Sequence, residues 1–491
     1  MQTRLLRITL VAAASLLATG AHAQASPAAN GMEALRVAAQ KALATNPDVN
    51  ARLNALRASG AALNAIEGGL RPKVDLEASV GHTSDRITTN LPPNQSLSRH
   101  GVALSVSQLL WDANVIRSDI ERGGHEKRAR WFEFLDASEG AVLEAVRAHH
   151  DVTRQRALLA LAEDNYVQHK YASTQIGSRV RAGVGRGVDG EQANARLALA
   201  ESNLSTETAN LHDVTARYLR IVGELPPARV TRIAASNAGL PASAGEASSV
   251  ALQASPAISA AIENLRAARA NARGREGSAW QPRVEARLRS GVGRNFDGVA
   301  DQKRDTSAEV ALNWNLYNGG SDQARIRQAA DNVNQAADQR DRACRDTRQV
   351  AGIAFNDTRK YAEQLEALDR NVLAIEKARD AYRQQVDIGQ RSLLDLLNAE
   401  NELYTARRAY ANAEHDLLIA QARALAATQR LATQLGLTRP QADGDAAGWS
   451  AGEDVPARCP ALAIEALGTL PRSELDARAQ RLVQQAPPLK Q

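Results

Sequence analysis

Apolar and polar side chains alternate along two pairs of short segments, one pair within 73–110 and the other within 283–317. In the first segment Val74 and Leu76 share one face, and Glu77 lies on the other. Alternation of period two predicts β-strands with one apolar face, and about 9–11 residues is the length of a strand that crosses a membrane in a barrel. A soluble β-sandwich gives the same pattern, so both interpretations stay open on this signal alone.

A long segment without proline follows each strand pair, at 112–182 and at 321–388. At 1.5 Å per residue, each could form a helix of about 100 Å. The second segment is followed by residues with a seven-residue apolar repeat: Leu396, Leu403, Tyr410, Leu417, Ala424 and Leu431. A sustained repeat of this kind predicts a left-handed coiled coil. We therefore expect two helical hairpins, 112–223 and 321–436.

The chain contains one internal duplication. The segment at 42–47 returns with similar residues at 251–256, and Arg71 to Val74 return as Gln281 to Val284. Such self-similarity predicts two copies of one structural unit. The expected division is a signal peptide at 1–23, a first repeat at 24–225 (helix, strand pair 73–110, hairpin 112–223), a linker at 226–245, a second repeat at 246–436 (helix, strand pair 283–317, hairpin 321–436) and a partly disordered C-terminal tail at 437–491.

The first 23 residues have the features of a secretory signal. Arg4 and Arg7 precede a short apolar run at 8–17, and Ala21 and Ala23 are the small residues that a signal peptidase requires. The segment contains no cysteine, so we expect no N-terminal lipid anchor. The protein is therefore expected to be exported, into a bacterial envelope.

Composition narrows the function classes. The mean hydropathy is −0.37, and no mature segment has 18 apolar residues in a row, which argues against a helical membrane protein. The net charge is +5, and no block of Lys and Arg marks a surface for nucleic acid. Only Cys344 and Cys459 are present, and because one lies in a long helix and the other in the tail, we expect no disulfide between them.

Four strands are too few to close a barrel, for which about eight are needed. An open sheet edge is not tolerated in lipid. If these strands cross a membrane, several chains must therefore share one barrel, and three chains would supply twelve strands.

The two hairpin tips carry the most specific motif. In each, a glycine is followed after five residues by an aspartate: Gly183 and Asp189 in the first tip, Gly389 and Asp395 in the second. Glycine permits a tight reversal, and aspartate is expected to cap the returning helix. Together with the duplicated unit, these tips resemble the TolC family of outer-membrane efflux channels over 30–436, and the first tip at 183–196 is most similar to the type I secretion branch.

The resemblance implies a mostly helical fold with a small β part. In it, a trimeric 12-stranded membrane β-barrel, with four strands from each chain, continues into a long α-helical periplasmic barrel of coiled-coil hairpins. It also implies a homotrimer in outer-membrane lipid that extends into the periplasm. Its partners would be a periplasmic adaptor (membrane fusion protein) and an inner-membrane pump of the ABC or RND type. Substrates would leave by passive passage through this duct.

The same resemblance implies roles for residues at the tips. Asp395 would form an acidic constriction at the periplasmic end, with Asn398 at the position of a second family aspartate. Asp189 and Arg391 would hold the closed state, while a family tyrosine falls near Val386 and is absent there. The adaptor would contact Gly183, Val184, Gly389 and Gln390. A plainer interpretation makes the two aspartates helix caps and Arg391 a solvated charge.

Other functions have weaker support. A drug-efflux duct is the close alternative to protein secretion; a periplasmic coiled-coil adaptor would have one hairpin, and a structural coiled coil would not explain the strands. His149 and His150 are adjacent on a helix and point about 100° apart, so they are poorly placed to share a metal ion. The glycines from Gly183 lack the lysine of a phosphate loop. We expect no catalytic residue, no metal, no cofactor and no nucleic acid, and hence no enzyme.

Overall fold

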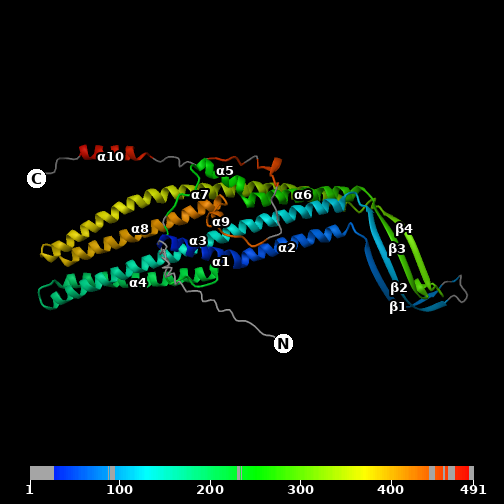
Figure 1. The fold of residues 1–491 in the computed structure, drawn as a ribbon, viewed down its shortest axis with the longest axis horizontal. Coiled ribbons are helices and arrows are strands. Elements are labelled where there is room, and N and C mark those ends of the chain that lie inside the picture. Colours follow the sequence, from blue (N-terminus) through cyan, green and yellow to red (C-terminus); the bar gives the residue numbers. More distant parts are fainter. Residues whose placement is uncertain are drawn as a thin grey trace, which may run out of the picture.

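The computed structural model describes residues 27–86, 88, 94–228, 233, 235–441, 448–456, 459–462 and 470–485. The expected signal peptide lies outside these residues. Figure 1 shows an elongated molecule, with a β-sheet at one end, two helical hairpin tips at the other and shorter helices alongside the middle. The mostly helical fold with a small β part is therefore confirmed.

The sheet contains β1 (Lys73–Arg86), β2 (Asn94–Trp111), β3 (Arg283–Arg294) and β4 (Arg304–Asn313). The strands are antiparallel and follow the order β1-β2-β3-β4, so the two strand pairs of the sequence lie side by side in one sheet. The expected length of about 9–11 residues was too short for the first three strands, which have 14, 18 and 12 residues.

The second strand pair ends before residue 317, contrary to the sequence prediction. The last residue of β4, Asn313, pairs with Arg283, which is the first residue of β3. Before Arg283 the chain is Pro282, which has no amide to donate, and then the helix that ends at Trp280. No strand is therefore available to pair with 314–317, although apolar and polar residues still alternate there.

Two long hairpins make up most of the molecule, as the sequence predicted. The first contains α3 (Val115–Arg181) and α4 (Gly187–Val222), and the second contains α7 (Ser321–Asp387) and α8 (Leu393–Ala427). With 67 residues each, α3 and α7 are about 100 Å long. The second hairpin ends earlier than residue 436, because a left-handed Gln429 (φ 58°) separates α8 from the short helix α9 (Leu431–Gln434).

Matching short helices show the duplication. In the first repeat α1 (Pro27–Thr45) and α2 (Pro47–Gly68) meet at Asn46, whose side chain accepts from the Asp48 amide. In the second repeat α5 (Ala244–Ala254) and α6 (Pro256–Trp280) meet at Ser255, whose side chain accepts from the Ile258 amide. Each cap is followed by a proline, which fits the first turn because that amide has no helical partner.

The main core lies in the middle of the molecule, where these helices cross. It is formed by α1, α2, α3, α4, α8 and α9, with buried members that include Leu43, Phe134, Val142, Tyr218 and Leu431. The core fixes one hairpin against the other at mid-length. The sheet and the tips project from it in opposite directions (Figure 1).

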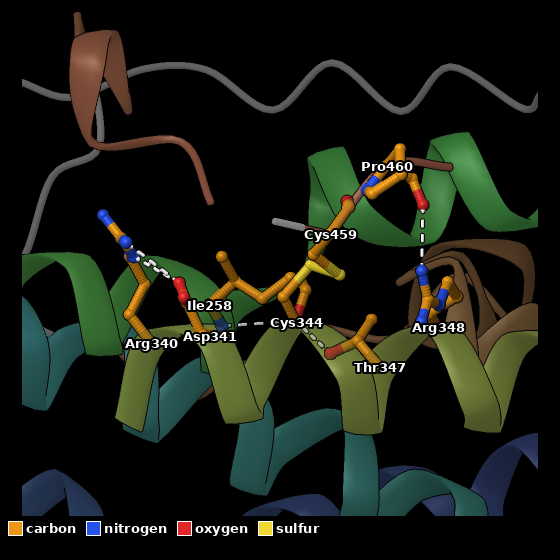
Figure 2. Close-up of a disulfide and its surroundings, with 9 residues drawn as sticks. Ile258, Arg340, Asp341, Cys344, Thr347, Arg348, Cys459 and Pro460 are labelled. Atoms are coloured by element: carbon orange, nitrogen blue, oxygen red, sulfur yellow. Dashed lines mark hydrogen bonds and ion pairs between the residues drawn. A yellow bond between two sulfur atoms is a disulfide. The ribbon is translucent and has the colours of Figure 1, made fainter. Parts of the chain in front are cut away.

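The expectation that the two cysteines stay apart was wrong. Cys344 of α7 and Cys459 of the tail form a disulfide, with 6.2 Å between their Cα atoms (Figure 2). The reason lies in the tertiary structure. Residues 448–456 and 459–462 fold back along the bundle and pack on α6 and α7, and we call them the tail strap. A segment with no helical or strand periodicity gives no sequence signal for such a return.

Polar contacts hold the tail strap in place, in addition to the disulfide. Arg266 of α6 donates to the Asp454 carboxylate at 2.8 Å, and Arg348 of α7 donates to the Pro460 carbonyl at 3.2 Å. Trp449 donates its indole N–H at 2.8 Å to Glu263, which is fully buried in α6. Beyond the strap, α10 (Arg472–Gln485) is an exposed amphipathic helix.

Candidate functional site at the hairpin tips

The first tip reverses the chain within five residues. After α3 ends at Arg181, Gly183 takes a left-handed conformation (φ 76°) and α4 begins at Gly187. Asp189 was expected to cap α4, but the cap position belongs to Arg186, so Asp189 lies inside the first turn. There its carboxylate still complements the positive end of the helix dipole. Val184, an expected adaptor contact, is the exposed end of this tip.

The second tip has the same reversal and a more complete cap. Gly389 is also left-handed (φ 76°), and α8 begins at Leu393. The cap is Ser392, whose Oγ accepts from the Asp395 amide at 3.2 Å, while Oδ2 of Asp395 accepts from the Ser392 amide at 3.2 Å. This reciprocal pair is a capping box. The sequence held the signal for it, a serine three residues before the aspartate, which our interpretation of Asp395 as the cap overlooked.

The structure brings the two tips together through Asn398. Arg196 of α4 donates to Oδ1 of Asn398 at 3.1 Å, which joins the first hairpin to the second. Beside this bond Ile176 of α3, Ala193 of α4 and Leu397 of α8 form a small buried cluster. Arg196 lies in the tip motif, but sequence reasoning assigned it no role because the contact crosses between hairpins.

Asp189 and Arg391 are not brought together within one chain. Among the described residues, neither takes part in an ion pair with the other; the Arg391 guanidinium lies over the Tyr382 ring, 5.1 Å from its centre. The sequence has valine at position 386, near which the family tyrosine was expected to fall. Tyr382, one helical turn earlier, instead provides the aromatic contact for this arginine.

Two buried carboxylates tie helices together above the tips. Glu400 of α8 accepts from Arg379 and Arg383 of α7, at 3.1 and 3.0 Å. Glu207 of α4 is 1% exposed and forms an ion pair with Arg408 of α8 at 2.6 Å. A buried carboxylate without a partner lowers the free energy of unfolding. Each of these carboxylates therefore favours a packing in which the neighbouring helix keeps its arginine within reach. Sequence reasoning missed all of them, because nothing in one sequence tells these charges from solvated ones.

The adjacent histidines are core residues. His149 and His150 of α3 are both buried, and burial is the main cause that lowers the pKa of His149 to about 4 and of His150 to about 3. Both rings are therefore neutral at physiological pH. Within the described ranges, no group of three or more His, Cys, Asp or Glu residues is arranged to hold a metal ion.

Among the helices of the described part of the chain, none combines enough length with enough apolar character to cross a membrane.

A family model for the outer membrane efflux protein matches this chain at residues 38–224 and 247–428. The two matched ranges fall one in each of the two repeats. The outer membrane efflux protein BepC of Brucella suis is 29% identical over 338 residues, covering 68% of this chain and 74% of that protein. The proteases secretion protein PrtF of Dickeya chrysanthemi is 38% identical over 22% of this chain and 24% of its own length.

Solved structures share the fold at low sequence identity. The Campylobacter jejuni CmeC outer membrane channel has a TM-score of 0.73 and 14% identity, with 81% of this chain and 86% of that chain covered. The open-state Neisseria gonorrhoeae MtrE outer membrane channel has a TM-score of 0.67 and 18% identity, with 81% and 89% covered. The chain therefore belongs to the outer membrane efflux protein family, the TolC family, and is an outer-membrane channel component that extends into the periplasm.

Proposed function

We propose that three copies of this chain form a passive exit duct, in which a 12-stranded barrel continues into a tunnel of helical hairpins. The observation that carries this proposal is the four-stranded sheet. Among the described strands, β1 and β4 each have one edge without a partner. Pairing β4 of one copy with β1 of the next would satisfy both edges, and three copies would complete a barrel of ordinary size.

The two faces of the sheet support this assembly. Apolar side chains on one face are strongly exposed in the single chain, with Val80 88%, Leu76 72% and Val310 69% exposed. The other face carries charged residues, including Glu77 of β1, Arg287 of β3 and Glu309 of β4. An apolar outer band and a charged lumen are the requirements of a water-filled barrel in lipid.

The tips would form the periplasmic entrance of this duct. We assign Asp395 and Asn398 to its constriction and Asp189 and Arg391 to its closed state. We assign Gly183, Val184, Gly389 and Gln390 to contact with a periplasmic adaptor, which would link the duct to an inner-membrane ABC or RND-type pump. The exposure of both tips, at the end of the molecule opposite the sheet, supports these roles (Figure 1). The family is one of transport channels, and we assign no catalytic residue or cofactor.

A gating experiment tests the tip assignment. Replacing Arg196 by Ala removes its bond to Asn398 between the hairpins, and replacing Arg391 or Asp189 by Ala removes the proposed closing charges. Each change should increase the open time or conductance of single channels in planar bilayers. Arg370→Ala, on the exposed surface of α7, is a matched control that should leave both quantities unchanged. Unchanged channels in all three tip variants would contradict the gate.

The proposed cargo is protein, through type I secretion. It is supported by PrtF and by the alkaline protease secretion protein AprF of Pseudomonas aeruginosa, which is 30% identical over 26% of this chain. Drug efflux is the second candidate, supported by the longer match to the efflux protein BepC. Deleting the gene should abolish secretion of a protein under the first proposal. A deletion strain with normal secretion but greater drug sensitivity would favour the second.

A further inference from the structure

The loop between β3 and β4 folds back onto the sheet instead of extending from it. Its short helix η1 (Phe296–Gly298) contacts β2 and β3, and Phe296 is only 4% exposed. The loop is also closed by backbone bonds: the Phe296 amide donates to the Gln302 carbonyl at 3.0 Å. An aromatic side chain thus has a fixed position on the sheet, near the free ends of β3 and β4.

Two glycines make room for the Phe296 ring. A Cβ added to Gly101 of β2 would lie 2.4 Å from Cδ2 of the ring, and one added to Gly291 of β3 would lie 2.1 Å from Cζ. Ala103, which pairs with Gly291, is buried as well. Any larger residue at either glycine would displace the ring, so the strands are shaped for this contact.

Charges hold the loop in the same place. Arg289 of β3 donates to both carboxylate oxygens of Asp297, at 2.6 and 3.2 Å, and its guanidinium lies 5.2 Å from the centre of the Phe296 ring. Asn295 donates to the Ser98 carbonyl of β2 at 2.9 Å. A carboxylate held by two parallel bonds from one arginine is among the stronger surface pairs.

The backbone of the loop supports a fixed conformation too. Three residues other than glycine are left-handed: Asn295 (φ 49°), Asp297 (φ 54°) and Asp301 (φ 62°). Such conformations are unfavourable and persist where surrounding contacts hold them. The contacts of Phe296, Asn295 and Asp297 with the sheet are of this kind.

The ring lies on the charged face of the sheet. Gly101 pairs with Ser79 and Ala103 with Glu77, while the neighbouring Val80 and Val102 lie on the opposite, apolar face. In the proposed barrel, the charged face lines the lumen. The loop therefore folds into the mouth of the channel, at the end away from the helices.

We propose that the β3–β4 loop forms a second, outer constriction of the channel, in which the loop narrows the mouth while Phe296 and the pair of Arg289 with Asp297 anchor it to the sheet. This proposal rests on the proposed function, because the lumen exists only in the assembled barrel. In a trimer, three copies of this loop, each anchored to the sheet by its buried Phe296, would project into the mouth. The solutes it excludes would be large hydrophilic molecules entering from outside.

Cysteine labelling from outside the cell tests the outer constriction. Ser105→Cys places a thiol on the charged face of β2, two residues beyond Ala103 toward the helices, and the native cysteines are bonded to each other. With a bulky, membrane-impermeant maleimide, we expect Phe296→Ala to increase the labelling rate at least about threefold. Asp297→Asn should increase it less, because the ring contact remains. Val299→Ala changes an exposed residue of the same loop and should have no effect.

The outcomes separate this proposal from the proposed function. Equal labelling rates with and without Phe296 would overturn the outer constriction and leave the barrel intact. Leu104→Cys lies on the apolar face and should stay unlabelled in every background. If Leu104→Cys is labelled and Ser105→Cys is not, the assignment of the two faces is wrong, and the proposed barrel is overturned with it. No labelling of either thiol on cells, with full labelling after denaturation, would overturn the outward orientation of the mouth.

Discussion

Asp395 takes part in the cap of a helix, and we propose a second role for the charge of the same side chain. Its carboxylate closes the capping box of α8 with Ser392, and its charge is the one assigned to the entrance constriction. Asp395→Asn removes the charge, so we expect weaker cation preference and weaker block by multivalent cations at the periplasmic side of a planar bilayer. Ser392→Ala weakens the cap by about 1 kcal/mol but keeps the charge. If Ser392→Ala changes selectivity as much as Asp395→Asn does, the effect comes from the helix end and not from an acidic ring.

His149 and His150 should make the helical bundle sensitive to acid. Burial, with Arg156 nearby, holds the pKa of His149 at about 4; burial, with His149, His415 and Arg154 nearby, holds that of His150 at about 3. The unfolded chain has the usual value of 6.5, so it binds more protons than the folded chain below that pH. The contribution of these two histidines to the free energy of unfolding is therefore fully present above pH 6.5, and it is lost as the pH falls toward 4.

The size of this loss can be measured by urea unfolding followed by circular dichroism. Each unit of pKa shift corresponds to about 1.4 kcal/mol, so the free energy of unfolding should fall by a few kcal/mol between pH 6.5 and pH 4. His149→Leu should flatten this part of the curve, since neither ring nitrogen of His149 has a hydrogen-bond partner among the described residues. His212→Leu, on an exposed side chain, is the control. Parallel curves for His149→Leu and the unchanged protein would contradict the assignment.

At the residue scale, the sequence located the tips but not their contacts. The spacing of glycine and aspartate indicated both reversals, because left-handed turns and helix starts depend on local residues. The partners of Arg196 and Arg391 depend on how two hairpins pack, and that information is spread over the whole chain. The expected pairing of Arg391 with Asp189 is accordingly replaced, within one chain, by a contact with Tyr382.

At the scale of the helices, Glu207 is a buried polar tie between the two hairpins. Besides Arg408 of α8, Gln155 of α3 donates to its Oε2, and Asn210 of α4 does so at 3.2 Å. Arg408→Leu should lower the free energy of unfolding by about 3 kcal/mol, because it leaves a buried carboxylate with amide donors alone. Arg370→Leu, which removes the exposed pair with Glu366, should cost less than about 0.5 kcal/mol. If Arg408→Leu and Arg370→Leu lower the free energy of unfolding equally, Glu207 is solvated in the assembled protein.

Periodicity accounts for the elements that were predicted well. The second hairpin has a seven-residue apolar repeat and the four strands alternate, and each of these elements is present in the structure. The end of β4 was misplaced because a strand also needs a partner, and α6 occupies the place where that partner would be. The tail strap has no period at all, so its return to α6 and α7 could be learned only from the structure.

At the scale of the whole molecule, the tail strap connects the end of the chain to the second repeat. It spans α6 and α7, where Arg266 and Arg269 both hold Asp454, and Phe132 of α3 packs edge-on against Trp449 at 4.9 Å. The disulfide adds a covalent link at the same place, and Figure 2 shows Cys459 directly above Cys344 on α7. The exported location of the protein is compatible with such a bond, since oxidising compartments preserve disulfides.

Breaking this link should destabilise the helical bundle without altering the channel. The disulfide closes a loop of 115 residues, for which the chain-entropy model gives about 4–5 kcal/mol as an upper value. We therefore expect the double variant Cys344→Ser with Cys459→Ser to melt at a lower temperature and to lose its tail faster to a protease. Its conductance should be unchanged, because the strap lies far from both the tips and the sheet. Asp454→Asn in the oxidised protein is the matched control, since it weakens the ion pairs and keeps the covalent bond. If the double serine variant keeps its melting temperature while Asp454→Asn lowers it, the arginine contacts and not the disulfide hold the strap to the bundle.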